Sequence, residues 1–530
     1  MHKHVVDARA LRWISMQQVA AFCGLLAVVI ILQIVDGAFH SELGGHPDEP
    51  PHYVTGLLVR DYIAAGLPGS PLAYAQDYYD HYPKVALGNW PPGFYLLQAA
   101  WTLAFSPQRT PVMLLMAALT ALLGTVLFAA LRSLFNTPMA VAGALFLVTL
   151  PLVQWLSARV MPDTTVALLS LVAIIFFGRF LDSERGSDAL LFGLFSAAAV
   201  LTKGTGLALA LVPPVALLLT SKWHLLKRPS LWGAALIVAV LAGPWTWMFR
   251  EVTRASWAAD SLDAQFLRWA IPFYATEWAA AIGLAFVPLA CLGVWATLGT
   301  TARRHEAHGI WPASAALMVG LLLLLVVTPA GTEARYLMPI IPPTILFCAA
   351  GVWALSDLTA DWSRYLRIAA AALFIGLAAW SAAGATVKNE TGYEAVVKSV
   401  LERPDAAKAR LLIVSDAVGE GQFIAEMAMR EHRPGHTIRR ASKVLSSSSW
   451  TGRNYRLLVR NPDHFLSLLA SENIDLLVVD QTVPSPLPHE GIVLEALRTH
   501  PDRFHLLSRF SATRDSKTYP DGISLYAIIR

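Results

Sequence analysis

The sequence predicts a polytopic α-helical membrane protein of about eleven spans that ends in a soluble α/β domain. Of its 530 residues, 55% are apolar and only 15% are charged, which is too apolar for an ordinary soluble protein. From about residue 387 the long apolar stretches stop, and short apolar runs alternate with polar turns. We therefore expect a transmembrane domain over residues 1–386 and a soluble α/β domain over 387–530.

The expected spans are stretches of roughly 17–25 predominantly apolar residues, which is the length that crosses a bilayer as a helix. They cover residues 19–35, 110–131, 138–157, 163–181, 189–202, 206–220, 231–249, 278–300, 310–328, 337–356 and 367–386. The first follows basic residues and shows no small-residue cleavage site, so we expect a retained span with a cytoplasmic N-terminus. Cys23, Cys291 and Cys348 all lie in apolar segments, so no disulfide framework is expected.

The apolar stretch Pro91–Phe105 is short for a span and opens with two prolines, so we expect a helix in the outer interface. Basic residues in short loops favour the cytoplasmic side. If Pro91–Phe105 does not cross, Arg132, Arg185 and Arg303 fall inside together with the other basic short loops. The C-terminal domain then lies outside the cytoplasm. The loop 250–277 is also expected outside, as a solvated loop or a mobile lid.

The C-terminal segment alternates strand-like and helix-like patterns over about 140 residues, enough to bury its own core. The expected strands are 411–415, 476–480, 504–510 and 523–529, and the expected helices are 423–430, 464–472 and 491–499. The net charge of +4 comes with no basic run, so no nucleic acid partner is expected.

An acidic pair, Asp48-Glu49, follows the first apolar segment between histidines and prolines. Ionisable residues at a membrane boundary are costly and are therefore often functional. One carboxylate can act as a general base toward a hydroxyl. The pair can also bind a divalent metal ion, with His46 or His52 as a further ligand. A solvated loop with acids at these positions is the alternative.

Two more charged residues interrupt apolar sequence. Asp163 stands between two expected spans, where it is either an N-cap or a catalytic acid. Lys203 lies in a Thr-Lys-Gly turn, where it either reaches the interface or binds an anion.

Near the tenth span, Arg335 and Tyr336 follow Glu333. An arginine fork suits a phosphate, and a Glu–Arg surface pair is the alternative. Trp90 could shape a substrate entrance or serve as an interface aromatic. The sequence shows no Walker motif, zinc-ligand spacing or nucleophile elbow.

Taken in order, five of these stretches resemble the motifs of the GT-C glycosyltransferases. They are Pro47-Asp48-Glu49, Trp90-Pro91-Pro92, Pro162-Asp163, Thr202-Lys203-Gly204 and Arg335-Tyr336. The likeness is closest to the protein O-mannosyltransferases and the lipid A aminoarabinose transferases, and it covers roughly residues 15–350. Residues 51–53 and 89–90 depart from the aminoarabinose transferase pattern.

The resemblance implies a GT-C-like bundle in a bacterial plasma membrane, with its active site at the outer face. It implies transfer of a sugar from a polyprenyl-phosphate donor to a hydroxyl of a glycan, glycolipid or protein. Asp48 is then the base, and Asp163 is an acid that either supports the site or faces the acceptor. Lys203 and Arg335 are the candidate ligands of the carrier phosphate. Glu49 would orient Asp48 or help to hold a metal.

The remaining expected substrate contacts are His52, Tyr53, Trp90 and Tyr336, and the possible metal ligands are Asp48, Glu49 and His52. Two other functions stay open at this point. A lipid-linked sugar flippase or transporter would place its charges near the bilayer midplane. A polysaccharide polymerase would share the transfer chemistry.

Overall fold

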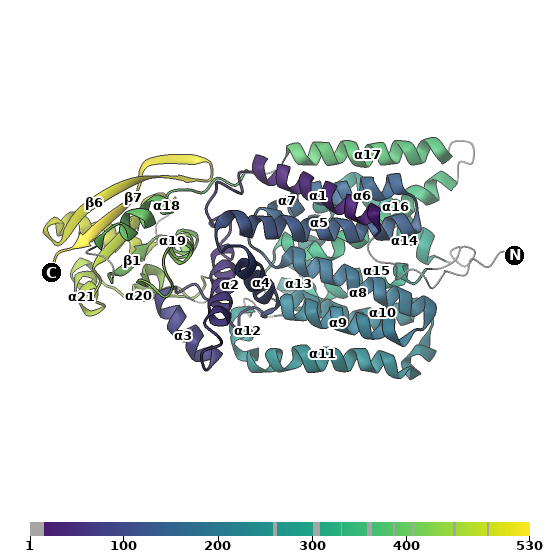
Figure 1. Ribbon diagram of the computed structural model, residues 1–530, viewed down its shortest axis with the longest axis horizontal. Coiled ribbons are helices and arrows are strands. Elements are labelled where there is room, and N and C mark those ends of the chain that lie inside the picture. The colour runs from purple at the N-terminus through teal and green to yellow at the C-terminus, as the bar shows by residue number, and fades with distance from the viewer. Residues whose placement is uncertain are drawn as a thin grey trace.

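The computed structural model describes residues 15–257, 262–299, 308–329, 331–357, 363–384, 387–404, 408–448, 452–484 and 487–530. A long helical bundle carries an α/β domain at one end, and α2, α3 and α4 lie between the two parts (Figure 1). This arrangement confirms the predicted fold class.

The helical part contains the following α-helices: α1 (Met16–Val35), α2 (Glu49–Ala64), α3 (Pro71–His81), α4 (Gly93–Ala104), α5 (Arg109–Leu134), α6 (Thr137–Thr149), α7 (Pro151–Ser157), α8 (Asp163–Ser183), α9 (Gly186–Thr202), α10 (Val212–Thr220), α11 (Pro229–Met248), α12 (Arg250–Trp257), α13 (Ala264–Ile282), α14 (Val287–Leu298), α15 (Ile310–Val327), α16 (Ile341–Asp357) and α17 (Ser363–Ala383). Short 3₁₀ helices join several of them: η1 (Gly204–Leu211), η2 (Trp223–Lys227), η3 (Leu284–Phe286) and η5 (Ala334–Ile340).

The chain is a multi-pass membrane protein. Within the described residues, six helices are long and apolar enough to cross a membrane, or up to eight if each bent pair counts as one span. Three shorter apolar helices, Gly186–Thr202, Gly204–Thr220 and Ile368–Trp380, coincide with further predicted segments. The predicted number of about eleven is therefore reached only when these shorter helices are included.

Two predicted spans are bent rather than straight. The segment over 138–157 is broken between α6 and α7 by 63°, at Pro151, because proline cannot donate its backbone hydrogen bond. The segment over 278–300 belongs to a longer pair, α13 and α14, with a 94° bend. Gly283 occupies the bend with φ +85°, a conformation that favours glycine.

The expectation of a loop over 250–277 is wrong, because α12 and most of α13 lie there. The Asp263 side chain accepts a hydrogen bond from the backbone N–H of Phe266 at 2.8 Å and so caps α13. Phe266, Ala270 and Tyr274 then form one buried stripe at helical spacing. The predictive signal was this spacing, which the charged residue Arg268 and the internal Pro272 obscured.

The helix α4 is the predicted interface helix. Its 12 residues span about 18 Å at 1.5 Å per residue, which is less than the roughly 30 Å of a bilayer core. Its start lies close to the end of α9, because a Cβ at Gly93 would come within 2.8 Å of the Leu201 carbonyl oxygen. This close approach brings the Trp90 loop next to the Lys203 turn.

The α/β domain is built on a five-stranded sheet in the order β2-β1-β5-β7-β6. The strands β1 (Arg410–Val414), β2 (Thr437–Arg440) and β5 (Leu476–Asp480) are parallel, and β6 (Phe504–Arg514) and β7 (Lys517–Ile528) complete the sheet antiparallel. The helices are α18 (Tyr393–Leu401), α19 (Ala417–Arg430), α20 (Ala441–Val444), α21 (Pro462–Ser471) and α22 (Pro488–Thr499). The strands β3 (Ser446–Ser447) and β4 (Arg456–Leu457) form a small separate ribbon. All four predicted strands and all three predicted helices are present.

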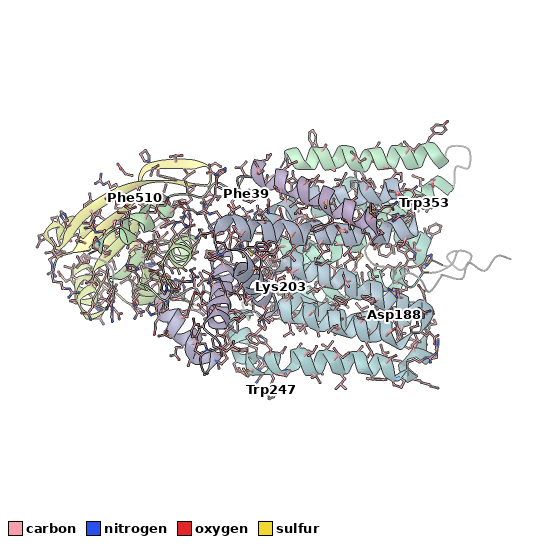
Figure 2. All side chains as sticks on the ribbon, viewed as in Figure 1. Phe39, Asp188, Lys203, Trp247, Trp353 and Phe510 are labelled. Carbon is pink, nitrogen blue, oxygen red and sulfur yellow. The ribbon has the colours of Figure 1, made fainter. Side chains whose placement is uncertain are left out.

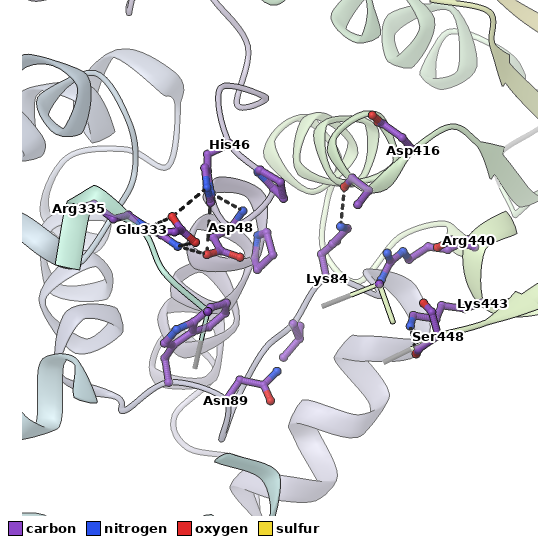
Figure 3. Close-up of a pocket in the computed structure, with 18 of the residues that line it drawn as sticks. His46, Asp48, Lys84, Asn89, Glu333, Arg335, Asp416, Arg440, Lys443 and Ser448 are labelled. Atoms are coloured by element: carbon purple, nitrogen blue, oxygen red, sulfur yellow. Dashed lines mark hydrogen bonds and ion pairs between the residues drawn. The ribbon is translucent and has the colours of Figure 1, made fainter. Parts of the chain in front are cut away.

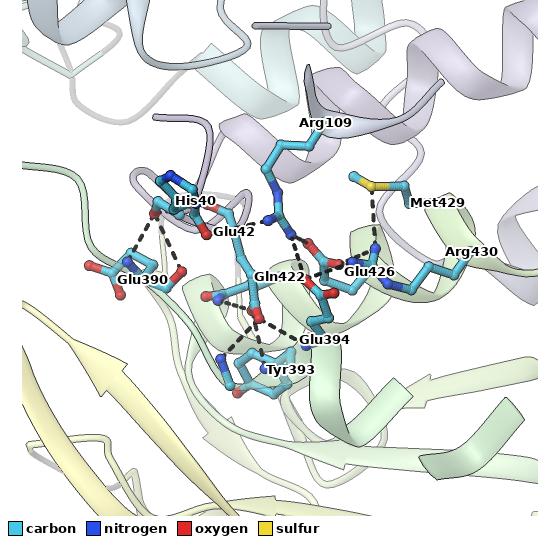
Figure 4. Close-up of polar contacts among 12 residues, drawn as sticks. His40, Glu42, Arg109, Glu390, Tyr393, Glu394, Gln422, Glu426, Met429 and Arg430 are labelled. Carbon is cyan, nitrogen blue, oxygen red and sulfur yellow. Dashed lines mark hydrogen bonds and ion pairs between the residues drawn. The ribbon is translucent and has the colours of Figure 1, made fainter. Parts of the chain in front are cut away.

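A buried polar network, which we call the junction, fixes the α/β domain to the bundle (Figure 4). The Glu42 carboxylate, only 2% exposed, accepts hydrogen bonds from the first backbone N–H groups of α18 and from the Gln422 amide. Nearby, Arg109 at the start of α5 pairs with Glu426 at 2.8 Å. Glu426 also pairs with Arg430 at 2.6 Å. The domain is therefore held by matched charges on both sides of the contact.

Candidate functional site

A cavity of about 830 Å³ lies where the bundle meets the α/β domain. We call its two sides the bundle wall and the domain wall. The bundle wall includes His46, Asp48, Trp90, Lys203, Glu333, Arg335 and Tyr336; the domain wall includes Lys84, Asp416, Arg440, Ser442, Lys443, Ser446 and Tyr455. Figure 2 labels Lys203 at the end of the bundle that faces the α/β domain, with Asp188 and Trp353 toward the opposite end.

Asp48 is the centre of an ion-pair cluster on the bundle wall (Figure 3). Its Oδ2 lies 2.5 Å from Nη2 of Arg335. Arg335 also pairs with Glu333, with Nε to Oε2 at 2.6 Å. The Asp48 side chain keeps 16% exposure, whereas that of Arg335 keeps 5%. Asp48 stands immediately before α2, so the start of that helix sets its position.

His46 joins this cluster from the same loop. Its Nε2 lies 3.5 Å from Glu333 Oε2, and its Nδ1 lies 3.8 Å from Asp48 Oδ2. Burial opposes the ionisation of Glu333, but the hydrogen bond with His46 and the charge of Arg335 outweigh burial and lower the pKa of Glu333 to about 2. Glu333 is therefore a carboxylate at any physiological pH.

The cluster also contains a potential set of metal ligands. His46, Asp48 and Glu333 each offer one ligand atom, and these atoms lie within 4.8 Å of one another. Imidazole nitrogen with carboxylate oxygens suits a divalent transition metal. The predicted set of Asp48, Glu49 and His52 does not come together in this way.

Glu49 and His52 face away from the cluster because α2 begins between them and Asp48. Glu49 is fully buried and pairs with Lys388 at 2.7 Å. It also accepts hydrogen bonds from the backbone N–H groups of Gly45 and Val160. His52 is buried with Nδ1 2.9 Å from the Tyr95 hydroxyl, and burial lowers the pKa of its imidazole. A neutral His52 packs with its ring centroid 4.3 Å from that of Trp90, so it supports the wall rather than lining it.

Tyr53 lies one residue further along α2 and also does not line the cavity. It is fully buried, and its hydroxyl donates to the Pro107 carbonyl oxygen at 2.6 Å. Trp90 does line the cavity and is 9% exposed. Among the predicted aromatic contacts, Trp90 and Tyr336 therefore reach the cavity and Tyr53 does not.

Asp163 and Lys203 were singled out separately, and the structure pairs them. Nζ of Lys203 lies 2.5 Å from Oδ1 of Asp163, with both side chains buried. The N-cap of α8 is Pro162, so Asp163 is not the cap. The ring of Tyr336 contacts both cations of this wall, with its centroid 4.8 Å from Lys203 Nζ and 5.5 Å from Arg335 Cζ. The ring thus joins the Asp163–Lys203 pair to the Asp48 cluster.

The domain wall was not anticipated. Lys84, 7% exposed, extends from the loop before α4 and donates to the Ala417 carbonyl oxygen at 2.8 Å. Burial, followed by the charge of Arg440, lowers its pKa to about 7. Lys443 and Arg440 lie on the same side of the cavity (Figure 3). Isolated basic residues in polar sequence form no recognisable motif. The one available signal was that, apart from His81, Lys84 is the only ionisable basic or acidic residue between Asp80 and Arg109.

Comparison with known proteins agrees with this geometry. The family model for dolichyl-phosphate-mannose-protein mannosyltransferases matches residues 89–247. The structure of ArnT from Cupriavidus metallidurans bound to undecaprenyl phosphate superposes with a TM-score of 0.57 at 14% identity, covering 97% of this chain and 98% of that one. This chain has the GT-C fold. The predicted GT-C resemblance is thereby confirmed.

Archaeal oligosaccharyltransferases share the GT-C fold at a similar distance. AglB from Archaeoglobus fulgidus, in complex with an inhibitory peptide and a dolichol-phosphate, gives a TM-score of 0.56 at 12% identity over 97% of this chain and 74% of that one. A complex of the Archaeoglobus fulgidus oligosaccharyltransferase with zinc and sulfate gives a TM-score of 0.54 at 12% identity, covering 95% of this chain and 73% of that one. No curated protein sequence matches the chain.

Proposed function

We propose that this GT-C protein is a membrane glycosyltransferase that moves a sugar from a polyprenyl-phosphate donor to an acceptor hydroxyl. The observation that carries the proposal is the Asp48 carboxylate, partly exposed in a cavity whose wall also holds Lys203 and Arg335. Structural relatives are seen with undecaprenyl phosphate and with dolichol-phosphate, which supports a lipid-phosphate donor for this chain too.

Asp48 is the proposed general base. Arg335 engages its Oδ2, and the other carboxylate oxygen takes the proton of the acceptor hydroxyl. The acceptor oxygen then bonds to the anomeric carbon as the bond from that carbon to the phosphate oxygen breaks. The phosphate leaves with the electron pair, next to Lys203 and Arg335. Cations held where charge develops are an effective form of transition-state stabilisation.

A single displacement of this kind inverts the anomeric configuration. Retention would require a second carboxylate free to act as a nucleophile. Asp163 is the other acid near Lys203, and it is buried in the ion pair with that lysine. This arrangement favours inversion over a covalent glycosyl intermediate.

A divalent metal ion fits the site. Asp48, Glu333 and Asp163 supply three carboxylates against two cations, Lys203 and Arg335, so the cluster carries one excess negative charge that would attract a cation. His46, Asp48 and Glu333 would hold it. Such an ion, when bound, would act as a Lewis acid toward the donor phosphate.

The charge distribution disfavours the flippase or transporter. A translocation path would place ionisable groups near the bilayer midplane. The Asp48 cluster and Lys203 instead line one cavity, and Lys203 lies at the end of the bundle that faces the α/β domain (Figure 2). A polymerase would use the same site and differ only in its acceptor.

The site is proposed to face the extracytoplasmic side, with the α/β domain, because the basic short loops lie at the opposite side in the predicted topology. A reporter active only outside the cytoplasm, fused after Arg530, is expected to be active. Activity of a cytoplasmic reporter at that position would reverse the topology.

The decisive assay supplies the purified protein with a polyprenyl-phosphate sugar or a nucleotide sugar, each alone, together with membrane acceptors. Transfer from the lipid-linked sugar with inversion is the expected result. Transfer from the nucleotide sugar without a lipid, or a product with retained configuration, would contradict the proposal. Comparing glycolipids and polysaccharides with and without the protein would identify the sugar and the acceptor.

A further inference from the structure

The two walls of the cavity differ in how their charges are matched. On the bundle wall each cation has a carboxylate partner: Lys203 has Asp163, and Arg335 has Asp48 and Glu333. On the domain wall Arg440 pairs with Glu420 at 2.7 Å, and Asp416 pairs with Arg514. Lys84 and Lys443 remain.

Neither of these two lysines has a carboxylate partner among the ion pairs that the described residues form. Nζ of Lys84 contacts the Ala417 carbonyl oxygen at 2.8 Å, and Nζ of Lys443 contacts that of Ser448 at 3.4 Å. Burial and the neighbouring charge of Arg440 lower the pKa of both. Lys84 is buried, and a buried cation without a paired carboxylate is unfavourable, so an incoming anion would stabilise this wall.

Hydroxyl side chains lie at the same spot, where Ser442 donates to Glu420 at 2.6 Å and Ser446 donates to the Ser442 carbonyl oxygen at 3.1 Å. Ser442, Ser446 and Tyr455 line the cavity with Lys84, Arg440 and Lys443. Figure 3 shows Lys84, Arg440 and Lys443 on the side of the cavity opposite His46, Asp48, Glu333 and Arg335. Ammonium, guanidinium and hydroxyl groups together suit the oxygens of a phosphate or a carboxylate.

We propose that the domain wall binds an anionic group of the acceptor, a phosphate or a carboxylate, through Lys84, Lys443 and Arg440. This inference rests on the proposed function, which places the donor phosphate on the bundle wall. A lipid-linked donor comes from the membrane, so the domain wall, which the α/β domain forms together with Lys84, is left for the acceptor. The acceptor is then an acidic sugar or a phosphorylated glycan, and its charged group sits across the cavity from Asp48.

The test measures binding by the full-length protein in lipid nanodiscs, with undecaprenyl phosphate present at saturation so that the donor phosphate site is filled. The probes are methyl glucoside 6-phosphate, methyl glucuronide and neutral methyl glucoside. We expect at least one anionic probe to bind about tenfold or more tightly than the neutral sugar, as for one added charge-assisted hydrogen bond. The phosphate and carboxylate probes show which anion the wall prefers.

Lys443→Gln is expected to remove most of this preference, and Lys84→Met to do the same. Lys443 is exposed in the cavity, so its replacement does not disturb the core. Lys517→Gln is the matched control, because Lys517 is an exposed lysine of the same domain outside the cavity. Undecaprenyl phosphate binding should stay within about twofold in Lys443→Gln.

Two outcomes would overturn the inference. Equal binding of neutral and anionic probes would mean that the wall does not select charge. If Lys443→Gln weakened undecaprenyl phosphate binding as much as it weakened binding of the anionic probe, the lysines would belong to the donor site. These binding measurements do not require transfer, so a failed transfer assay with an intact anionic preference would sink the proposed function and leave the domain-wall site in place.

Discussion

Asp48 and Glu49 are neighbours in the sequence but belong to two different regions of the molecule. Asp48 lies on the cavity wall with 16% of its side chain exposed, whereas Glu49 is fully buried beside the junction. Three donors satisfy Glu49: the Lys388 ammonium and the backbone N–H groups of Gly45 and Val160. Asp48 engages Arg335 with one oxygen and keeps access to the cavity.

The two carboxylates therefore differ in their access to the cavity rather than in chemical type. The junction (Figure 4) uses the same residue types as the site, but its carboxylate Glu426 is fully buried between two arginines, Arg109 and Arg430. A sealed pair can only stabilise the arrangement that contains it. A pair that opens onto a cavity can exchange its partner for a substrate.

The sharpest test of this contrast is Asp48→Asn. We expect transfer to fall by about 10²–10⁴-fold, the usual effect of losing a general base, with little change in thermal stability because Glu333 still pairs with Arg335. Single-turnover transfer and thermal unfolding measure the two effects. Asp80→Asn, at an exposed site on α3, is the control. Wild-type turnover by Asp48→Asn would remove Asp48 from the mechanism.

The matching change on the sealed side is Glu49→Gln. It leaves the Lys388 ammonium buried without its carboxylate, which typically destabilises a protein by about 3–5 kcal/mol. We expect a lower unfolding temperature but normal turnover per folded molecule at low temperature. The double variant with Lys388→Met should recover part of the stability. Loss of turnover with unchanged stability would instead place Glu49 in the chemistry.

Lys203→Met probes the other cation of the bundle wall. Losing a charge that meets a phosphate in a dry site should weaken undecaprenyl phosphate binding by about 2–5 kcal/mol. Acceptor binding should change little. Because the change also leaves the Asp163 carboxylate unpaired, donor binding is also measured in the double variant Asp163→Asn/Lys203→Met. Full donor affinity in the double variant would show that Lys203 serves only Asp163.

The smallest expected effect is a pH dependence that arises in the junction. Burial, followed by repulsion from Glu426, raises the pKa of Glu42 from 4.5 to about 7. The folded protein therefore holds this proton more tightly than the unfolded chain. The resulting stability is fully present below pH about 4.5 and is lost as the pH rises through about 7.

The unfolding temperature of the wild type should accordingly fall between pH 5 and 8, and Glu42 should account for about 2–4 °C of that fall. Glu42→Gln should flatten part of the decline. The remainder is expected from Glu390, whose pKa burial also raises to about 7. An identical pH profile in Glu42→Gln would mean that Glu42 is ionised throughout this range.

The sequence was a good guide to the elements and a poorer one to their partners. Apolar length and strand-like runs predicted the helical bundle and the sheet of the α/β domain. They could not show that Asp163 and Lys203, 40 residues apart, pair with each other, because each residue taken alone suits several roles. For Arg335 the sequence offered a phosphate ligand or a Glu–Arg pair as alternatives. In the structure Arg335 pairs with Glu333 and also lines the cavity.

The candidate metal ligands show most clearly what the sequence could not predict. The sequence places two histidines near Asp48, but the residue at which α2 begins decides which histidine lies near the Asp48 carboxylate. His46 lies before the helix and reaches Glu333, whereas His52 lies inside it and packs on Trp90. The domain wall could not be predicted at all, because Lys84 and Lys443 meet only through the tertiary fold.

The Glu49–Lys388 pair also constrains the order of biogenesis. Its two members are 339 residues apart, and the backbone of Lys388 donates to the Asp36 carbonyl oxygen at 2.7 Å, just after α1. A ribosome has therefore synthesised nearly the whole membrane part before the loop that carries Asp48 can be locked in place. A nascent chain inserted only as far as α16 has its membrane anchors but not this closure. The loop that carries Asp48 is completed last, when translation reaches the α/β domain.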